Sequence, residues 1–480
     1  MRLLRRSVVV FAAAGVALPL PAQRPVAGAV LDSISHFIAH ELARQHIPGL
    51  SLVILQGDSV VLSRGWGESN VELYVPASDS TIYQSGSMGK QFTAAGVELL
   101  AQDGKLSFAD PILKWIPEGP AAWQGITIRQ LLTHTSGIAD YTDSTLDLRR
   151  DYTEADLVRL AAVKALDFRP GERWSYSNTG YLLLGIIIHR VSGQFYGDFL
   201  HDRVFTPVGM RTTRVISEAD IVPNRAAGYV WAGDRLKNQE WVSPTLNTTA
   251  DGALYFTVRD LAQWAIALNH GRVPSRTGLD SAWLPARLND GSVYPYGFGW
   301  SLVPQRGLRR IGHSGAWQGF RTAIMRYPDF DLTIAALANL EQAKPELIVA
   351  AVAGILHPEL TPPYLLKAPL PGPAAPTSIA DVLRGVADST DARVATPGLR
   401  RFLTADDRHF IGGLLQHAGD LTPLGCDAVG TKGIVRLDAR IERICYASTQ
   451  VVTEGERLTR IVTIWFTTDG KVAGVDTYTW

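Results

Sequence analysis

Residues 83–93 read Tyr83-Gln84-Ser85-Gly86-Ser87-Met88-Gly89-Lys90-Gln91-Phe92-Thr93, and a helical pattern begins within this stretch. A helix places positions i and i+3 on one face, so the hydroxyl of Ser87 and the amine of Lys90 can meet across one turn. Serine is a weak nucleophile at neutral pH unless a neighbouring base takes its proton. The spacing therefore indicates a nucleophile beside its base, and the structural alternative is a capped surface helix.

Two later segments carry further polar groups beside apolar elements. Tyr176-Ser177-Asn178 supplies a phenol and a carboxamide two positions apart, just before an apolar stretch at 181–188. His313-Ser314-Gly315 precedes residues 320–325, which are predicted to form a strand. Three polar clusters on turns next to apolar elements are what an acyl-transfer site requires.

With these motifs, the chain resembles the penicillin-recognising serine hydrolases, in the branch of class C β-lactamases, DD-peptidases and D-aminopeptidases. The resemblance covers residues 26–360 and includes the flanking segments Leu131–Gly137, Pro207–Met210 and Tyr296–Trp300. It implies a two-lobed α/β (α+β) β-lactamase/DD-peptidase-like fold, in which an antiparallel sheet flanked by helices joins a helical lobe. The active site is then expected in the cleft between the two lobes.

The resemblance also implies a role for each residue of the motifs. Ser87 is the implied nucleophile, Lys90 and Tyr176 handle protons, and Asn178 orients the substrate. His313-Ser314-Gly315 stands where Lys-Thr-Gly is more common, although histidine occurs there in some DD-peptidases and D-aminopeptidases. The backbone N–H groups of Ser87 and Ala316 are the implied donors to the oxyanion that forms during acyl transfer.

The proposed base must lose its proton near neutral pH. Lysine and tyrosine have reference pKa values of about 10.4 and about 10, so one of them must fall by roughly three units. Burial and a neighbouring cation-capable group can supply the roughly 4 kcal/mol that this shift requires. The sequence leaves open whether Lys90 or Tyr176 is the base.

In the His313-Ser314-Gly315 motif, a histidine stands where a lysine would carry a permanent positive charge. Imidazole titrates at about 6.5, so we expect partial positive charge on His313 at neutral pH and a weaker requirement for a substrate carboxylate. Packing beside Trp317 is the structural alternative for His313. Gly315 would allow close approach of the substrate, or it would form an ordinary β-bulge. For His134 a structural role in its turn is favoured.

Other functions lack their motifs. His36 and His40 are one helical turn apart, but Arg44 stands where a His-Glu-x-x-His zinc motif needs its second histidine. Ser85 replaces the first glycine of a Gly-x-Ser-x-Gly elbow. The 46 basic residues balance 46 acidic ones, so charge gives no source of nucleic-acid binding. We therefore expect no metal, no cofactor and no nucleic-acid partner.

The chain of 480 residues is long enough for more than one folding unit. Residues 1–22 have the basic start and short apolar segment of a secretory signal peptide, which predicts an exported, periplasmic or secreted protein without a membrane span in the mature chain. The hydrolase domain is predicted at 26–360, a proline-rich linker at 361–377, and a small α+β domain at 378–480. Cys426 and Cys445, the two cysteines, could pair in an exported protein or remain separate buried thiols.

Hydrophobic periodicity places the main elements. We expect a helix at 26–45, a strand hairpin at 50–55 and 60–65, and a mostly helical insertion over about 98–270. Further strands are expected at 300–303, 322–327 and 332–340. In the C-terminal domain Ser378 resembles a helix N-cap, a helical pattern continues at 410–415, and β-rich runs are expected at 434–452, 458–467 and 472–480.

The sequence thus predicts an exported serine hydrolase that is acylated on Ser87 by a peptide-like amide of the D-Ala-D-Ala or D-amino acid type. A carboxylesterase or a β-lactamase using the same site is the nearest alternative. A catalytically silent protein that binds cell-wall peptides is the alternative of another class, and it is disfavoured because all the expected reactive residues are present.

Overall fold

The computed structural model describes residues 26–143, 146–244, 246, 249–366, 378–388, 394–416, 421–429, 434–436, 439–453 and 456–479. The predicted signal peptide at 1–22 and residues 367–377 of the predicted linker lie outside these ranges. Within them, no helix is both long and apolar enough to cross a membrane.

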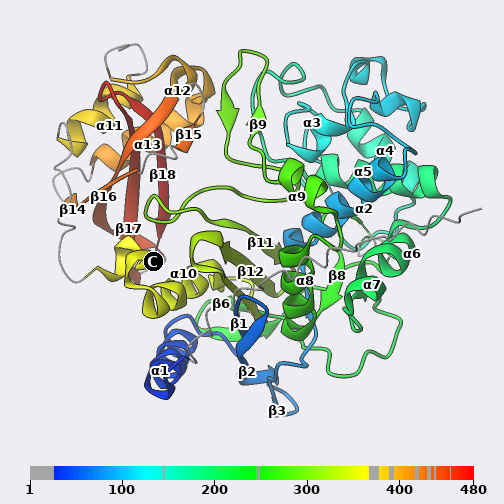
Figure 1. The fold of residues 1–480 in the computed structure, drawn as a ribbon, viewed down its shortest axis with the longest axis horizontal. Coiled ribbons are helices and arrows are strands. Elements are labelled where there is room, and N and C mark those ends of the chain that lie inside the picture. The colour runs from blue at the N-terminus through cyan, green and yellow to red at the C-terminus, as the bar shows by residue number, and fades with distance from the viewer. Residues whose placement is uncertain are drawn as a thin grey trace, which may run out of the picture.

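An antiparallel six-stranded sheet forms the centre of the larger unit (Figure 1). Its strand order is β11-β12-β13-β1-β2-β3, so the N-terminal hairpin pairs with strands from far along the chain. The central strand β1 is apolar along nearly its whole length and is buried on both faces, as expected for a continuous apolar run. The strands are β1 (Gly49–Gln56), β2 (Ser59–Asn70), β3 (Val75–Pro76), β11 (Ile311–Trp317), β12 (Phe320–Tyr327) and β13 (Leu332–Ala338).

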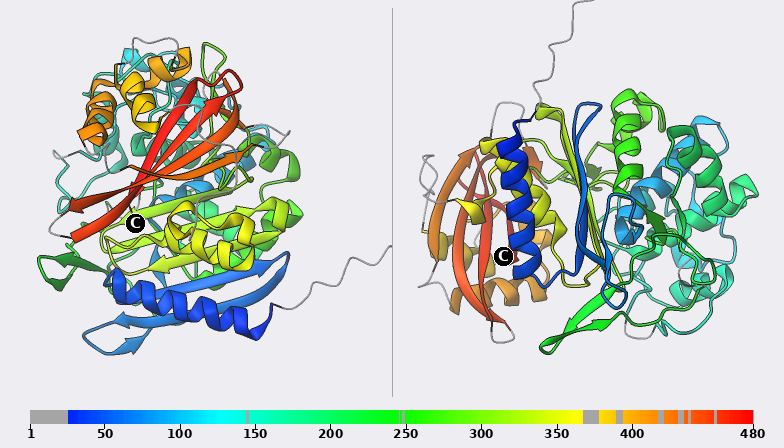
Figure 2. Two further views of the ribbon diagram at one scale, coloured as in Figure 1. Left: turned by 90° about the vertical axis from the view of Figure 1, so that its left-hand side faces the viewer. Right: turned by 90° about the horizontal axis from the view of Figure 1, so that it is seen from below.

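Helices cover both faces of this sheet, and alternate residues of the strands serve the two layers (Figure 2). Leu52 and Ile54 pack with α1 (Gly28–Arg44) and α10 (Pro345–Leu356) in one core cluster. Val53 and Leu55 belong to the other cluster, which contains the helical lobe. The sheet is therefore the shared wall between two hydrophobic layers.

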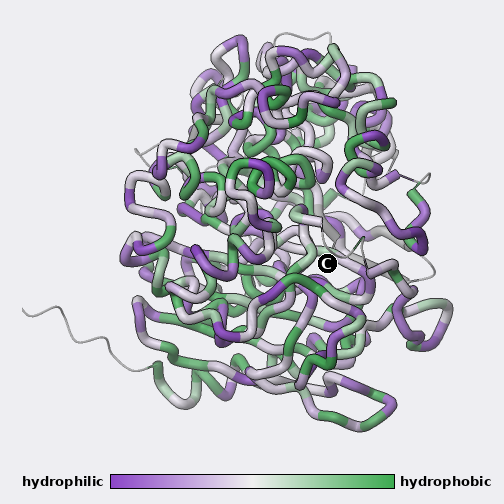
Figure 3. Tube along the Cα trace, turned by 90° about the vertical axis from the view of Figure 1, so that its right-hand side faces the viewer, coloured by the Kyte–Doolittle hydropathy of each residue, from purple (hydrophilic) through white to green (hydrophobic). Residues whose placement is uncertain are grey.

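The helical lobe follows the first hairpin and is built around α2, which is buried over almost all of its length. Its helices are α2 (Lys90–Gln102), α3 (Ile128–Leu132), α4 (Glu154–Ala162), α5 (Asn178–Ser192), α6 (Tyr196–Leu200), α7 (Thr206–Val208), α8 (Val258–His270) and α9 (Arg276–Ala282). Short strands accompany them: β4 (Tyr83–Gln84), β5 (Arg214–Val215), β6 (Tyr229–Ala232), β7 (Arg235–Asn238), β8 (Leu254–Phe256), β9 (Ala286–Arg287) and β10 (Val293–Tyr294). Hydrophilic residues gather mainly in the outer turns of the fold (Figure 3).

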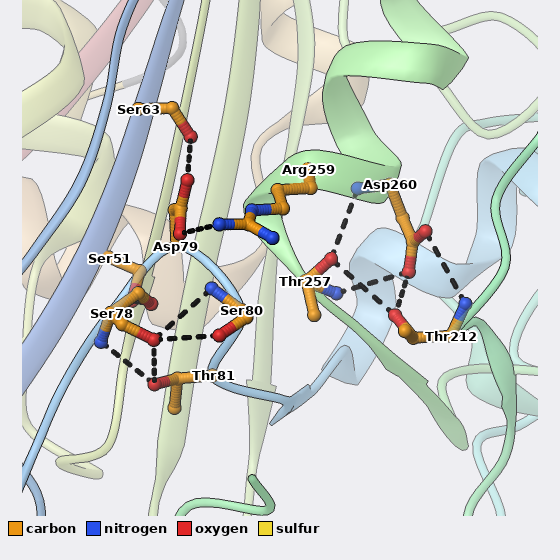
Figure 4. A network of polar contacts seen from close by, with 10 residues as sticks. All are labelled: Ser51, Ser63, Ser78, Asp79, Ser80, Thr81, Thr212, Thr257, Arg259 and Asp260. Atoms are coloured by element: carbon orange, nitrogen blue, oxygen red, sulfur yellow. Dashed lines mark hydrogen bonds and ion pairs between the residues drawn. The ribbon is translucent and has the colours of Figure 1, made fainter.

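A polar network fixes the start of α8 against the sheet (Figure 4). Thr257 caps the helix, because its hydroxyl accepts a hydrogen bond from the Asp260 backbone N–H at 3.1 Å. Arg259 pairs with Asp79 at 2.7 Å, and Asp79 also accepts a hydrogen bond from Ser63 of β2 at 3.0 Å. These contacts join the helix to β2 and to the turn that follows β3.

The C-terminal unit is an α+β domain, as predicted. Three helices, α11 (Ile379–Ala387), α12 (Pro397–Phe402) and α13 (Ala405–Gln416), precede an antiparallel sheet. Its strands are β14 (Thr422–Ala428), β15 (Ile434–Arg436), β16 (Ala439–Thr453), β17 (Glu456–Thr467) and β18 (Val472–Thr479). Cys426 of β14 and Cys445 of β16 face each other across the two strands and are joined by a disulfide.

Some local predictions were wrong. Residues 300–303 are not a strand, because Ser301 forms only isolated bridges to Tyr296 and Gly312. The β-rich run expected at 434–452, in contrast, is confirmed and contains β15 and β16. Ser378 occupies the N-cap position of α11, but its side chain makes no capping hydrogen bond. The first residues of the predicted linker also pack: Tyr364 donates a hydrogen bond to the backbone oxygen of Leu347 in α10 at 2.6 Å.

Candidate active site

Ser87 lies in the short 3-10 turn η1 (Gly86–Gly89), which runs directly into α2. The Nζ atom of Lys90 is 3.0 Å from the Ser87 Oγ atom, so the i, i+3 pair meets as the spacing predicts. Gly86 has φ +52°, and a Cβ atom there would lie 2.4 Å from the backbone nitrogen of Ala316. The turn that carries Ser87 is therefore pressed against β11.

Lys90 is completely buried, and its amine contacts three groups at the centre of the site. Besides Ser87, its Nζ atom contacts the Asn178 Oδ1 atom at 2.8 Å and the Asp251 backbone oxygen at 2.6 Å. Burial lowers the pKa of Lys90 to about 8, although the nearby carboxylates of Asp251 and Asp140 oppose the shift. At that pKa about one amine in ten is neutral at pH 7 and about half at pH 8, so the neutral form that a general base requires is present.

Burial shifts the pKa of Tyr176 in the opposite direction to the pKa of Lys90. Burial raises the pKa of its phenol above the ordinary value, and the nearby Ser87 hydroxyl offsets only part of that increase. The Tyr176 hydroxyl itself makes no hydrogen bond to any residue that the structure describes. Its ring centre lies 4.9 Å from Lys90 Nζ. The phenol of Tyr176 is therefore neutral at neutral pH.

The Asn178 amide is oriented by groups on both sides. Its Nδ2 atom donates to the Asp140 Oδ2 atom at 3.1 Å and to Thr142 at 3.2 Å, while its oxygen faces Lys90. Asp140 also accepts the backbone N–H of Asn178 at 2.8 Å. Because Asn178 is the first residue of α5, this carboxylate additionally lies at a helix N-terminus, where negative charge is stabilised. Asn178 therefore positions Lys90.

His134 supports the loop that carries Tyr176. Its Nδ1 atom accepts the backbone N–H of Ser177 at 3.2 Å, and its ring lies 4.4 Å from the ring of Tyr176. Burial holds the pKa of His134 well below its usual value. These contacts fit the structural role expected for this residue, and they leave its imidazole neutral.

On the opposite side of the cleft, His313 is almost fully buried in β11. Its Nδ1 atom is 2.5 Å from the backbone oxygen of Ser314, and its Nε2 atom is 2.9 Å from the Tyr296 hydroxyl. A carbonyl can only accept, so Nδ1 carries the hydrogen and Nε2 accepts from Tyr296 when the ring is neutral. Burial lowers the pKa of His313 to about 4. The expectation of partial positive charge at neutral pH was therefore wrong, because an unperturbed value was assumed for a desolvated ring.

The backbone packed around position 315 leaves room only for glycine. A Cβ atom at this position would lie 2.0 Å from the backbone oxygen of Ser85 and 2.9 Å from the backbone nitrogen of Met88. The pairing of β11 with β12 runs without a register shift, which excludes the β-bulge alternative. The group that approaches Gly315 closely in the structure is the turn that carries Ser87, whereas the sequence led us to expect a substrate there.

The predicted residues converge on one cleft of about 410 Å³. The cleft is lined from the helical side by Ser87 and Tyr176 and from the strand side by His313, Ser314, Gly315 and Ala316. Lys90 and Asn178 lie beneath it, through the contacts given above. Among the described residues, no group of three or more His, Cys, Asp or Glu side chains is arranged to hold a metal ion.

Sequence reasoning missed three groups that shape this site: Asp140, Asp251 and Tyr296. Tyr296 was noted only as part of a flanking motif, and its hydrogen bond to His313 joins segments that local periodicity cannot relate. Asp140 follows the Leu131–Gly137 motif by three residues, which is the one local signal for it. Asp251 acts on Lys90 through its backbone oxygen and its charge, and nothing in its neighbourhood indicates this.

The sequence matches the Beta-lactamase family over residues 34–357. The chain belongs to the beta-lactamase family, and its larger unit has that family's α/β fold.

Among individual relatives, Penicillin-binding protein 4* of Bacillus subtilis (strain 168) is 33% identical over 319 residues, which cover 63% of this chain and 70% of the relative. The octameric penicillin-binding protein homologue from Pyrococcus abyssi has a TM-score of 0.63 and 23% identity, with 93% of this chain and 98% of that chain covered. D-amino acid amidase from Ochrobactrum anthropi SV3, solved with L-phenylalanine amide, has a TM-score of 0.61 and 25% identity, covering 68% and 98% of the two chains.

Proposed function

We propose that this protein is a serine hydrolase that forms an acyl-enzyme on Ser87 with a peptide-like amide of the D-Ala-D-Ala or D-amino acid type. The observation that carries the proposal is the 3.0 Å contact between Ser87 Oγ and a buried lysine whose pKa is lowered to about 8. A neutral amine at this distance can take the serine proton as the nucleophile attacks.

The reaction follows from the protonation states. Ser87 Oγ bonds to the amide carbon and its proton passes to Lys90, while the carbonyl oxygen becomes negative and meets the backbone N–H groups of Ser87 and Ala316. The carbon–nitrogen bond then breaks, and the amine leaves with a proton relayed from Lys90 through the Tyr176 hydroxyl. Water resolves the acyl-enzyme by the same transfers in reverse order. In this scheme Lys90 is the base, because burial raises the pKa of Tyr176 above its ordinary value.

Neutral His313 bears on the substrate class. With its pKa lowered to about 4, the imidazole supplies no fixed positive charge for a substrate carboxylate at neutral pH. This favours D-amino acid amides over peptides that end in a carboxylate, and a D-amino acid amidase is among the proteins of similar structure. The same observation favours neutral esters, so carboxylesterase activity is the second candidate. β-Lactamase activity would additionally need efficient deacylation.

Covalent labelling tests the proposal. The protein is incubated with an organophosphonate or a fluorescent penicillin and its intact mass is measured. We expect one adduct on the wild-type chain and none on Ser87→Ala, with Ser107→Ala, an exposed serine outside the cleft, labelled like wild type. Labelling that survives in Ser87→Ala rejects the mechanism, and failure of both reagents to label the wild type favours a silent peptide-binding protein.

Substrate turnover then ranks the candidates. A D-Ala-D-Ala peptide, a D-amino acid amide and a short-chain ester are compared by kcat/KM. We expect the D-amino acid amide to be the best of the three, because it offers an amide without a carboxylate. Cleavage of the ester alone would make the protein a carboxylesterase.

We also propose that the protein is exported to the periplasm or secreted, on the basis of the signal-like residues 1–22 and the Cys426–Cys445 disulfide. Expression of the full chain followed by cell fractionation tests this. Recovery of an uncleaved product with reduced cysteines in the cytosol would contradict it.

A further inference from the structure

The two faces of the C-terminal sheet pack against different parts of the molecule. Along β16, Cys445 and Ala447 pack in the domain's own hydrophobic core. The alternate residues Ile444 and Tyr446 belong to a second cluster, together with Trp465 of β17 and Val303 of the hydrolase unit. The second face of this sheet is therefore directed at the hydrolase unit.

Specific contacts hold this arrangement beside the active-site cleft. Arg306 makes a bidentate ion pair with Asp427 of β14, at 2.6 and 2.8 Å, and both side chains are largely buried. Tyr294 stacks on Trp174, with ring centres 4.0 Å apart, and on Phe402 of α12 at 5.6 Å. Trp174 is two residues before Tyr176 in the chain. Tyr294 of the hydrolase unit thus lies between the C-terminal domain and the loop that carries the proposed proton carrier.

A pocket of about 570 Å³ lies between the two units. Its C-terminal wall includes Ile444, Tyr446 and Trp465, and the opposite wall includes Met325 of β12 with Leu347 and Ala350 of α10. Apolar and aromatic side chains form these two walls, while polar and charged residues, among them Arg310, Lys344 and Glu346, line the remainder. The volume falls within the roughly 300 to 1,000 Å³ range of small-molecule sites. The pocket is suited to a bulky apolar group.

This pocket adjoins the active-site cleft. Both cavities are lined by His313, Ser314, Lys344 and Glu346, so the pocket and the cleft are neighbours at these residues. Along β11, Gly315 and Ala316 lie beside the Ser87 turn, whereas His313 lies beside Tyr176, with ring centres 6.3 Å apart. The departing side of the substrate must lie near the proton carrier, and therefore near His313 and the pocket.

We propose that this interdomain pocket binds the leaving group of the substrate, and that the group is a bulky apolar amine, so that the C-terminal domain supplies part of the specificity of the hydrolase. The inference rests on the acyl-enzyme chemistry proposed above. It assigns to Ile444, Tyr446 and Trp465 contact with the leaving group and no part in bond breaking.

Filling the pocket from either wall tests the proposal. Ala350→Leu adds volume from α10, and Thr463→Leu adds it from β17, where Thr463 lines the pocket. Thr477→Leu makes the same substitution on the adjacent strand at a residue outside the pocket lining and is the matched control. Each variant is assayed with two D-alanine amides that differ only in the leaving amine, methylamine or naphthylmethylamine.

We expect the wild type to prefer the naphthylmethylamide. Both pocket variants should lose about 10-fold or more in kcat/KM for that substrate, since added carbon atoms in a fitted pocket exclude the larger group. The methylamide should be cleaved as by wild type, and Thr477→Leu should behave as wild type with both. Equal losses on the two amides, or no loss on either, would overturn the proposal, and the two filled variants guard against failure of either one to fold.

Ser87 labelling separates this inference from the proposed function. If no reagent labels the wild type, the proposed acyl-enzyme chemistry is wrong. If the wild type is labelled but both pocket variants keep its preference for the larger amide, only the assignment of the pocket is wrong. If neither amide is turned over, the decisive measurement is protection of Ser87 from the organophosphonate by naphthylmethylamine, which should occur in the wild type and weaken in both filled variants. Absence of protection in the wild type counts against the pocket.

Discussion

Each side of the cleft buries a basic residue, and burial lowers the pKa of both residues. Lys90, on the helical side, keeps a pKa of about 8 because the carboxylates of Asp251 and Asp140 oppose the effect of burial. His313, on the strand side, falls to about 4, and among the causes of its shift no carboxylate opposes burial. The two pKa values fall by about the same amount, from 10.5 to about 8 for Lys90 and from 6.5 to about 4 for His313. The residue type therefore sets the difference: burial leaves a lysine close to titration on one side and an imidazole that is neutral near pH 7 on the other.

The largest effect should come from removing the titratable amine on the helical side. Lys90→Arg keeps a positive charge but cannot release a proton in the neutral range. We expect kcat/KM and the rate of Ser87 labelling to fall by about 10² to 10⁴-fold, the range typical of lost general base catalysis. The exposed Lys105→Arg at the end of the same region is the control and should be unaffected. Labelling at close to the wild-type rate in Lys90→Arg would transfer the role of base to Tyr176.

On the strand side, the backbone should be more sensitive than the imidazole. Gly315→Ala forces a methyl group to within 2.0 Å of the Ser85 backbone oxygen, so β11 and the Ser87 turn must separate. We expect a loss of about 1 to 3 kcal/mol in the free energy of unfolding, as for other overpacked positions, together with slower labelling of Ser87.

Denaturant unfolding measures this change. Gly28→Ala, where an added Cβ atom has no neighbour within 4 Å, is the control. Wild-type stability and labelling in Gly315→Ala would show that the two sides of the cleft can move apart without cost.

The comparison also predicts a pH shift of intermediate size. Activity should increase as pH rises through about 8, because the neutral form of Lys90 is the reactive one. The Asp251 carboxylate raises the pKa of Lys90, so Asp251→Asn should move this increase to lower pH. The pH dependence of Ser87 labelling is the measurement, with the exposed Asp198→Asn as control. A shift to higher pH in Asp251→Asn would mean that the carboxylate does not act on Lys90 through its charge.

The sequence could predict much of this arrangement, but only where short spacing or a known motif carries the information. Ser87 and Lys90 are fixed by one helical turn, and the motifs containing Tyr176 and His313 locate the other walls. The carboxylates near Lys90 come from loops whose position depends on the packed helical lobe, so no local pattern indicates them. The same holds for residues 300–303, which resemble a strand yet form only isolated bridges, and for the interface made by β16 and β17.

The smallest effect, and the most direct test of the strand side, concerns substrate charge. His313 becomes positive only as pH falls towards about 4, so the ratio of kcat/KM for a carboxylate-bearing peptide to that for a neutral amide should stay constant across the neutral range. The ratio removes the loss of activity that both substrates share as Lys90 becomes protonated. It should increase only at acidic pH, where the imidazolium can attract the carboxylate.

His313→Gln provides the matched variant, because glutamine can accept the Tyr296 hydrogen bond but cannot become charged. We expect its ratio to equal that of wild type in the neutral range and to lack the acidic increase. A wild-type ratio that changes around pH 6.5, the ordinary histidine value, and is flat in His313→Gln would show that the ring is far better solvated than its burial implies. In that case burial would lower the pKa of Lys90 but not that of His313, and the two sides of the cleft would differ in their access to water.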